Sequence, residues 1–441
     1  MTIQRMMSVY FPTAAFIFCF EGFKGSHAAL FHAVTGLPAL IVACLLFFSE
    51  KLWRYRDVQL LAAITIWSWI SAAVSFGPSL YFFLSIHFTH WMFLLSMYFL
   101  MRSSTDPNPL LDRYASARSA GLSGACLIVL IHAVLSIRTS DLGHDRILGC
   151  FQLGRLCGMS NANSLGRYCA ALILISAFAL LRSSGRTRIP FAVSGLIGWL
   201  CLGLANSRSA ITSIAFFAAL MTLITVHDKI HNRNASLSLK ALLIIATSAV
   251  LVFVLVISLF YIPTHLFKSV ISAFAMATGN SELFSNVSVP TVRNMTTDLA
   301  TMEDRLLIWE RCLQDVFSTP RRTWMGVSDQ NFDKIAGVYP GHHEILTVNA
   351  HNMFLELLMR QGLIGLSIWL ILIVIWCIAG IRILFDPEEP QHIRCLAAAA
   401  AAILINGLAE AVPFSSTTGS GLSTPFFVIC AYCMNNRRSK E

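Results

Sequence analysis

Long apolar runs recur along the chain, separated mostly by short polar segments. A helix of roughly 20 apolar residues crosses a hydrocarbon core about 30 Å thick. One polar segment, residues 263–350, is far longer than the others. The pattern predicts twelve transmembrane helices, at residues 6–20, 28–48, 58–75, 80–101, 119–137, 165–181, 189–205, 209–226, 241–262, 362–384, 395–411 and 421–434.

This pattern places the chain in the all-α class, as a polytopic helical membrane protein with a large loop between the ninth and tenth helices. Three regions follow: helices 1–9 in residues 1–262, a helical cap in 263–350, and helices 10–12 in 351–441. The composition agrees, because 56% of the residues are hydrophobic and only 12% are charged. A soluble domain carries about twice that charged share.

The net charge of +9 indicates membrane orientation and not a nucleic-acid surface, because the basic residues gather in alternate short loops. Lys and Arg near membrane helices mark the cytoplasmic side. Both termini are therefore predicted in the cytoplasm, with residues 138–164, 263–350 and 411–420 on the opposite side. The cytoplasmic segments hold eighteen basic residues: Arg5, Lys51, Arg54, Arg56, Arg102, Arg113, Arg118, Arg182, Arg186, Arg188, Lys229, Arg233, Lys240, Arg382, Arg394, Arg437, Arg438 and Lys440.

The 263–350 segment carries the signals of an amphipathic helix. Thr301 and Asp304 have the spacing of a capping box, which predicts that a helix begins there. Apolar residues recur at helical spacing after Arg305, and Pro320 ends the pattern. We expect a small cap on the outer membrane–water interface, with Arg305 in the first turn, where free amide groups add positive potential.

A histidine stands where the polar segment gives way to the tenth apolar run. His351 and Asn352 are followed after nine residues by Gly362 and then Gly365. Histidine takes and returns a proton near neutral pH, and the glycines allow a bend where the chain enters the bilayer. His351 is therefore a candidate general base, although a lone histidine at a helix end is more often only a surface residue.

Two arginines on the same predicted side are candidates for anion binding. Arg208 lies in the tight turn between the seventh and eighth spans, and Arg305 lies in the cap. A guanidinium binds a phosphate or carboxylate through two parallel hydrogen bonds, but either arginine also suits a plain interfacial role. The chain has no D-x-D motif, so we expect arginines and not a metal to stabilise a phosphate leaving group.

These residues occur in an order that resembles the O-antigen ligase and polymerase superfamily. The resemblance covers roughly residues 150–385 and agrees with the twelve-span pattern. It rests on four short motifs: His351-Asn352-x9-Gly362-x-x-Gly365, Asn206-Ser207-Arg208-Ser209, Arg305-x3-Trp309, and the R-x-x-G…N pattern from Arg155 to Asn163.

The resemblance implies a GT-C-type glycosyltransferase that uses no cofactor and acts at the periplasmic face of the bacterial inner membrane. The ligases transfer an O-antigen polysaccharide from undecaprenyl diphosphate to a sugar hydroxyl of lipid A–core, with inversion and without a metal. By position, Arg208 and Arg305 would stabilise the leaving diphosphate, and His351 would accept the proton of the acceptor hydroxyl.

The same resemblance suggests four substrate-binding residues. Asn352 would orient the imidazole or an acceptor hydroxyl, and the weaker candidates Arg155, Asn163 and Trp309 would line the cavity. Glu410, near the outer end of the eleventh span, is a candidate to orient His351.

Other functions remain open at this stage. An O-antigen or exopolysaccharide polymerase would use the same donor with another lipid-linked glycan as acceptor, and some relatives glycosylate proteins. A secondary transporter predicts two related halves, which the chain does not display.

Most of the twelve cysteines lie inside apolar runs, where a cysteine usually acts as a small core residue. Cys150 and Cys157 share one loop. They form a disulfide only if that loop lies outside the cytoplasm, and the sequence leaves this open.

Overall fold

The computed structural model describes residues 3–23, 28–74, 89–135, 149–152, 154–159, 161–231, 239–288, 295–326, 350–414 and 420–440. Within these ranges the chain is mostly helical, with one small antiparallel hairpin. In chain order the elements are α1 (Ile3–Ile17), η1 (Phe18–Phe23), α2 (Ala28–Ser49), η3 (Leu52–Arg54), α3 (Arg56–Val74), α5 (Thr89–Ser103), α6 (Pro107–Leu135), β1 (Cys150–Gln152), β2 (Arg155–Cys157), α7 (Ala162–Arg182), η6 (Gly185–Arg188), α8 (Ile189–Ala205), α9 (Arg208–His231), α10 (Leu239–Leu259), α11 (Tyr261–Ala277), α12 (Ser281–Ser288), α13 (Met295–Val316), α14 (Pro320–Met325), α15 (Met353–Phe385), α16 (Gln391–Gly407) and α17 (Ser420–Lys440).

The apolar helices confirm a polytopic helical membrane protein. In the described part of the chain, seven helices are long and apolar enough to cross a membrane, and Val9–Glu21 and Thr35–Ser49 are shorter apolar helices. Each of the twelve predicted runs overlaps a helix of the structure. The count of twelve spans stays a prediction, because the other five of those helices are not among the seven found in the described residues.

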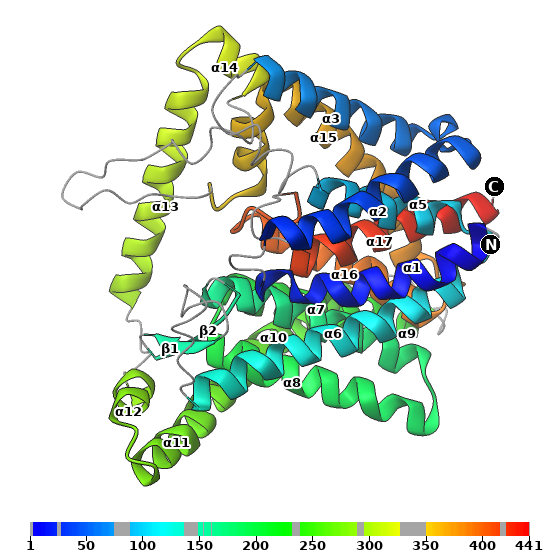
Figure 1. The fold of residues 1–441 in the computed structure, drawn as a ribbon. Coiled ribbons are helices and arrows are strands. Elements are labelled where there is room, and N and C mark those ends of the chain that lie inside the picture. Colours follow the sequence, from blue (N-terminus) through cyan, green and yellow to red (C-terminus); the bar gives the residue numbers. More distant parts are fainter. Residues whose placement is uncertain are drawn as a thin grey trace.

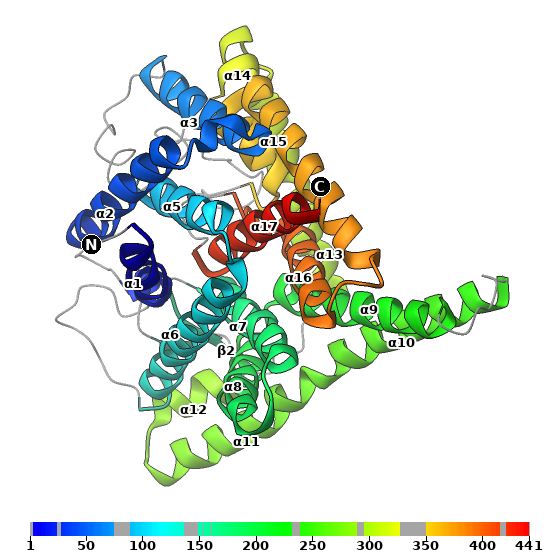
Figure 2. The ribbon, with the colours of Figure 1, turned by 90° about the vertical axis from the view of Figure 1, so that its right-hand side faces the viewer.

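Helix α7 lies in the middle of the bundle and packs against α6, α8, α9, α16 and α17 (Figure 2). Helix α16 packs closely because its facing residues are small: Ala398, Ala399 and Ala402 are at most 1% exposed. Small side chains let helix backbones approach each other closely. The close packing of α7, α9 and α16 brings the ends of these helices together at one face.

Helix α13 crosses one end of the bundle, and the N- and C-termini lie at the opposite end (Figure 1). Its buried residues Ile308, Cys312 and Val316 recur every four residues and contact Leu358 and Met359 of α15. The amphipathic character predicted for the cap is therefore confirmed: one stripe packs against α15, while residues such as Leu306 remain 57% exposed.

Two sequence predictions about the cap are wrong. Helix α13 begins at Met295 and not at the predicted capping box, so Thr301 lies inside the helix. Consequently Arg305 lies well inside the helix and not in its amide-rich first turn. Helix α13 ends at Val316, just before Pro320, as the pattern predicted. Pro320 occupies the first position of α14, whose N-terminus is capped by the Thr319 hydroxyl.

Arg118 also differs from its prediction as a cytoplasmic loop residue. It lies inside α6, is 0% exposed, and donates hydrogen bonds from its guanidinium to the carbonyl oxygens of Ala15 and Gly421 at 3.2 and 3.4 Å. These bonds satisfy a charge inside the bundle, so Arg118 ties three helices together and carries no information about orientation.

Candidate active site

The carboxylate of Glu410 is the point at which the candidate residues meet. Glu410 follows the end of α16, and its side chain is 2% exposed. Three basic side chains approach it: Nη1 of Arg167 on α7 at 3.8 Å, Nη2 of Arg305 on α13 at 3.7 Å, and Nδ1 of His351 at 3.6 Å. Four segments that are far apart in the sequence therefore converge on one carboxylate.

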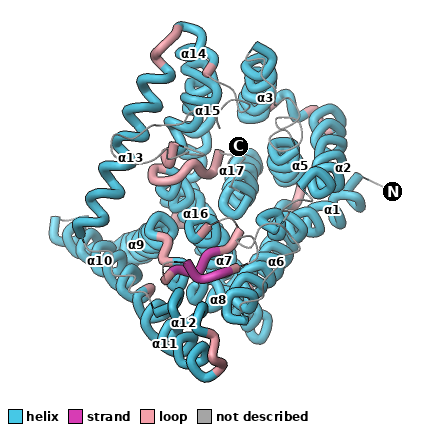
Figure 3. The backbone as a smooth tube through the Cα atoms, turned by 60° about the vertical axis from the view of Figure 1, so that its left-hand side comes forward, coloured by secondary structure: helices cyan, strands magenta, loops and turns pink. Residues whose placement is uncertain are grey.

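Two polar side chains complete the surroundings of this carboxylate. The hydroxyl of Ser209, at the start of α9, donates to Oε1 of Glu410 at 3.3 Å, and Nδ2 of Asn163, at the start of α7, donates to the same oxygen at 3.4 Å. Strand β2 packs against α7, the helix that begins beside Asn163, and the β1–β2 hairpin lies next to this helix in Figure 3.

The cluster has more positive than negative charge. Burial opposes ionisation of Glu410, but the interaction with the nearby imidazole of His351 and the charges of Arg167 and Arg305 outweigh it and lower the pKa of Glu410 below its usual value. Arg167 is 3% exposed, and its Nε and Nη1 make no hydrogen bond within the described residues. One buried carboxylate thus balances only part of the charge, which leaves donors for a further anion.

Hydrogen bonds to both backbone groups of Ala350, the preceding residue, fix the position of His351. The N–H of Ala350 donates to Oε2 of Glu356 at 2.8 Å, and its carbonyl oxygen accepts from the indole Nε1 of Trp309 at 3.0 Å. Arg360 holds the other oxygen of Glu356 at 2.6 Å. His351 itself has a left-handed backbone with φ of 49°, a conformation that costs energy in a non-glycine residue and persists because its neighbours fix it.

Asn352 is the N-cap of α15. Its Oδ1 accepts from the backbone amides of Phe354 and Leu355 at 3.0 and 3.2 Å, and its Nδ2 donates to the carbonyl of Leu408 at 3.1 Å. The side chain thereby joins the start of α15 to the turn that carries Glu410. The substrate-binding role expected for Asn352 stays a prediction.

The predicted bend at the glycines is confirmed at Gly362. Its φ of 65° and ψ of −170° interrupt α15. A Cβ atom there would lie 2.3 Å from the carbonyl carbon of Trp324, and one at Gly326 would lie 2.5 Å from that of Arg360. The backbone of the cap therefore crosses α15 at its kink, and only glycine permits both the dihedral angles and the contact.

Arg155 and Asn163, two weaker candidates, support the turn before Arg208. Arg155 donates from Nε to the carbonyl of Ala205 at 2.9 Å, and from Nη2 to Oδ1 of Asn163 at 2.9 Å and to the carbonyl of Asn206 at 3.1 Å. Asn206 has a left-handed φ of 47°. Arg208 is exposed at the first residue of α9, directly before Ser209, so the structure places it beside the cluster.

Sequence analysis missed Arg167. It lies within the predicted sixth span, and a charged residue inside an apolar run is a signal of function, because burying an unpaired charge in a membrane is costly. That signal was available at Arg167. Its contact with Glu410 was not, because it depends on how α7 and α16 pack.

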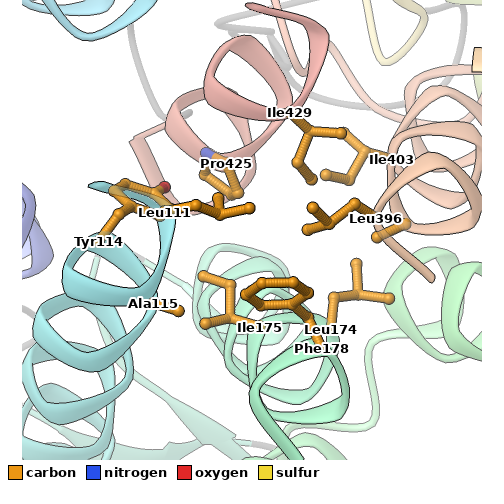
Figure 4. A pocket seen from close by; sticks show the side chains of 11 residues that line it. Leu111, Tyr114, Ala115, Leu174, Ile175, Phe178, Leu396, Ile403, Pro425 and Ile429 are labelled. Atoms are coloured by element: carbon orange, nitrogen blue, oxygen red, sulfur yellow. The ribbon is translucent and has the colours of Figure 1, made fainter. Parts of the chain in front are cut away.

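An apolar pocket lies within the bundle, separate from the cluster (Figure 4). Its walls come from α6, α7, α16 and α17 and include Leu111, Phe178, Leu396 and Ile429. None of the residues around Glu410 lines it, so the pocket is separate from the candidate active site. Within the described ranges, no group of three or more His, Cys, Asp or Glu side chains is placed to hold a metal ion.

The fold and the cluster together define a class: a polytopic helical membrane protein with a surplus of cationic groups at one end of its bundle. A family model described as O-antigen ligase matches residues 191–370. The chain is therefore similar to this family of polysaccharide-transferring membrane enzymes over a segment that contains Arg208, Arg305 and His351, which confirms the resemblance predicted from the sequence. A search of the curated proteins found no match.

Proposed function

We propose that the protein is an O-antigen ligase, which transfers an O-antigen polysaccharide from undecaprenyl diphosphate to a sugar hydroxyl of lipid A–core. The observation that carries the proposal is the convergence of Arg167, Arg305 and His351 on the buried carboxylate of Glu410. This arrangement combines anion binding with a proton acceptor, and both are needed when a hydroxyl displaces a diphosphate.

The arginines are proposed to bind the donor diphosphate. Two guanidinium groups against one carboxylate leave a net positive charge, to which Arg208 adds. Arg305 is 31% exposed, so a ligand can reach it, while Arg167 forms the buried floor. Charge that develops on the departing diphosphate is stabilised by donors already in place, which is how preorganised sites lower a barrier.

His351 is proposed as the general base. Its Nδ1 faces Glu410, so the tautomer with hydrogen on Nδ1 leaves Nε2 to accept a proton. The acceptor oxygen attacks the anomeric carbon as the carbon–oxygen bond to the phosphate breaks. The electron pair leaves with the diphosphate, the acceptor proton passes to Nε2, and the configuration inverts. Glu410 orients the imidazole and stabilises its protonated form.

The other groups position the reaction. Trp309 and Glu356 hold the peptide before His351, and Arg155 holds the turn before Arg208. Asn352, Asn163, Trp309 and Arg155 also remain proposed contacts to substrate. The proposed mechanism uses neither a metal nor a cofactor.

The proposed setting is the bacterial inner membrane, with twelve spans, both termini cytoplasmic and the cluster facing the periplasm. The placement of both termini opposite α13 supports this orientation (Figure 1). Reporter fusions within residues 263–350 test it, since activity of a cytoplasmic reporter there would reverse the orientation.

The decisive experiment incubates the purified protein with lipid-linked O-antigen, lipid A–core and EDTA. We expect lipid A–core to gain the polysaccharide with wild type and not with His351→Ala. His392→Ala is the matched control, because His392 contacts Arg182 on the cytoplasmic side of the predicted topology, and it should retain activity. If the lipid-linked glycan lengthens while lipid A–core stays bare, the protein is a polymerase. No change in either glycan, or loss of activity with EDTA, would contradict the proposed mechanism.

A further inference from the structure

The β1–β2 hairpin brings two cysteines together. Strands β1 and β2 are antiparallel, and Cys150 and Cys157 are directly opposite each other in the register. Opposite residues of an antiparallel pair project from the same face, with Cα atoms about 4.5–5.5 Å apart. A disulfide needs Cα atoms roughly 4.4–6.8 Å apart, so this register meets the backbone requirement.

The hairpin is anchored around this pair. Phe151 and Leu156 are buried at 5% and 0% exposure. Nδ1 of His132 on α6 contacts the carbonyl oxygen of Gly149 at 2.9 Å, and the Gly154 amide donates to the carbonyl of Asn286 on α12 at 3.0 Å. These contacts hold both strands in register, whereas an isolated two-stranded hairpin is marginal in water.

We infer that Cys150 and Cys157 form an intramolecular disulfide that closes the hairpin. The inference goes beyond the proposed transfer reaction and rests only on the register and on the proposed periplasmic orientation. In an oxidising compartment such pairs persist, and in the cytoplasm they are kept reduced.

The bond forms by thiol–disulfide exchange with an oxidised dithiol oxidoreductase or a small-molecule disulfide. Cys150 is partly exposed and Cys157 is 8% exposed. The hydrogen bond with Cys150, together with burial, raises the pKa of Cys157. Cys150 is the more exposed of the two thiols, so it is the one that attacks the oxidant first. This attack forms a mixed disulfide and releases one sulfur of the oxidant as a thiol. Cys157 then attacks the mixed disulfide, forms the bond to Cys150 and releases the second oxidant sulfur as a thiol. In total, two protons and two electrons pass from the cysteines to the oxidant.

The bond would act on the candidate active site through Arg155. This residue is two positions before Cys157 in β2, and its guanidinium donates to the carbonyl oxygens of Ala205 and Asn206 before Arg208. Locking the strands therefore fixes the guanidinium that supports the proposed donor-binding turn. Reduction should weaken donor binding, seen as a higher KM for the lipid-linked glycan, and leave kcat little changed.

The test maps disulfides in protein from oxidising cells. Free thiols are blocked with N-ethylmaleimide before solubilisation, and non-reduced peptides are analysed by mass spectrometry. We expect a cross-linked peptide joining Cys150 and Cys157. The matched control is the pair Cys126 and Cys169, whose Sγ atoms are 3.7 Å apart but buried inside the bundle, where no oxidant reaches them; both should remain thiols.

A second arm treats the reduced, purified protein with glutathione disulfide, which tests the geometry independently of membrane orientation. Mixed disulfides with glutathione and no internal cross-link would show that the register does not bring the thiols together and would overturn the inference. If the purified protein forms the cross-link but both cysteines are found alkylated in the protein from cells, the inference that the disulfide forms in cells is wrong. Both readouts are independent of transferase activity, so they stand or fall separately from the proposed function.

Discussion

The two ends of the helix bundle treat buried charge differently. At the end that holds the termini, two carboxylates each have an arginine of their own: Arg102 donates from Nε to Asp57 at 3.0 Å, and Arg394 donates from Nη2 to Asp228 at 3.0 Å. Tyr98 completes the first pair with a hydrogen bond of 2.6 Å to Asp57. At the other end, Glu410 is shared by Arg167, Arg305 and His351 at 3.6–3.8 Å.

The difference separates structural from functional charge. A closely matched pair with its hydrogen bonds satisfied offers nothing to a ligand, and removing one partner mainly destabilises the fold. When several basic side chains share one carboxylate at longer distances, some of their N–H groups make no close hydrogen bond to it. These N–H groups can bind an anion. Each prediction below therefore compares a change at Glu410 or its neighbours with a matched change elsewhere.

The largest expected effect contrasts Glu410→Gln with Asp57→Asn. Glu410→Gln should lower kcat by roughly 100-fold, because His351 loses the carboxylate that orients it, while KM for the anionic donor stays constant or falls. Asp57→Asn should lower the free energy of unfolding by about 3–5 kcal/mol and leave kcat of the folded protein unchanged. Steady-state kinetics and thermal unfolding distinguish the two, and equal losses of kcat would remove the distinction between the ends.

Arginine-to-lysine substitutions give a smaller effect. Lysine keeps the charge of Arg305 or Arg208 but loses the planar pair of donors, so KM for the lipid-linked donor should rise roughly 10-fold, the equivalent of one charge-assisted hydrogen bond. Arg102→Lys is the control at the paired end and should change stability but not KM. Full activity in Arg208→Lys and Arg305→Lys would exclude bidentate binding of the diphosphate.

A still smaller effect is expected from Trp309→Phe. The substitution keeps an aromatic ring and removes the hydrogen bond of 3.0 Å to the Ala350 carbonyl. That bond is worth about 0.5–1.5 kcal/mol, so kcat should fall roughly 2- to 10-fold with KM unchanged, if this bond positions His351. Trp324→Phe is the control, because Trp324 lies in the same cap but is 54% exposed. A rise in KM alone would instead give Trp309 the substrate contact predicted from the sequence.

The helices and part of the site could be predicted from the sequence, because both depend on local signals. Apolar runs specify helices, and His351 and Arg305 stand out as polar groups beside such runs. Arg167 was missed because its partner, Glu410, lies 243 positions away in the chain and meets it only through the packing of α7 and α16. The capping-box prediction failed because α13 continues upstream of Thr301 to Met295, so a local motif was overridden by its surroundings.

The smallest expected effect concerns acid stability. Because the pKa of Glu410 is lowered in the folded protein, its ionised form stabilises the fold at pH values above the ordinary carboxyl pKa of about 4.3, and this contribution is lost as the pH falls through the lowered folded value. Arg305→Gln removes one of the cations that lower this pKa. The folded pKa should move back toward its ordinary value, so the variant has less of this stabilisation at neutral pH and loses less on acidification.

The measurement is Tm as a function of pH between about 7 and 3. The difference in Tm between wild type and Arg305→Gln should be largest at neutral pH and shrink as Glu410 becomes protonated, because the carboxylate that Arg305 contacts has then lost its charge. Arg311→Gln is the control on the same helix, since Arg311 is exposed and should give a difference that does not vary in this way. If the difference in Tm between wild type and Arg305→Gln stays constant down to pH 3, Arg305 stabilises the fold independently of Glu410. The two ends of the bundle would then differ in the distances between their charged groups but not in the electrostatic effect of the shared carboxylate.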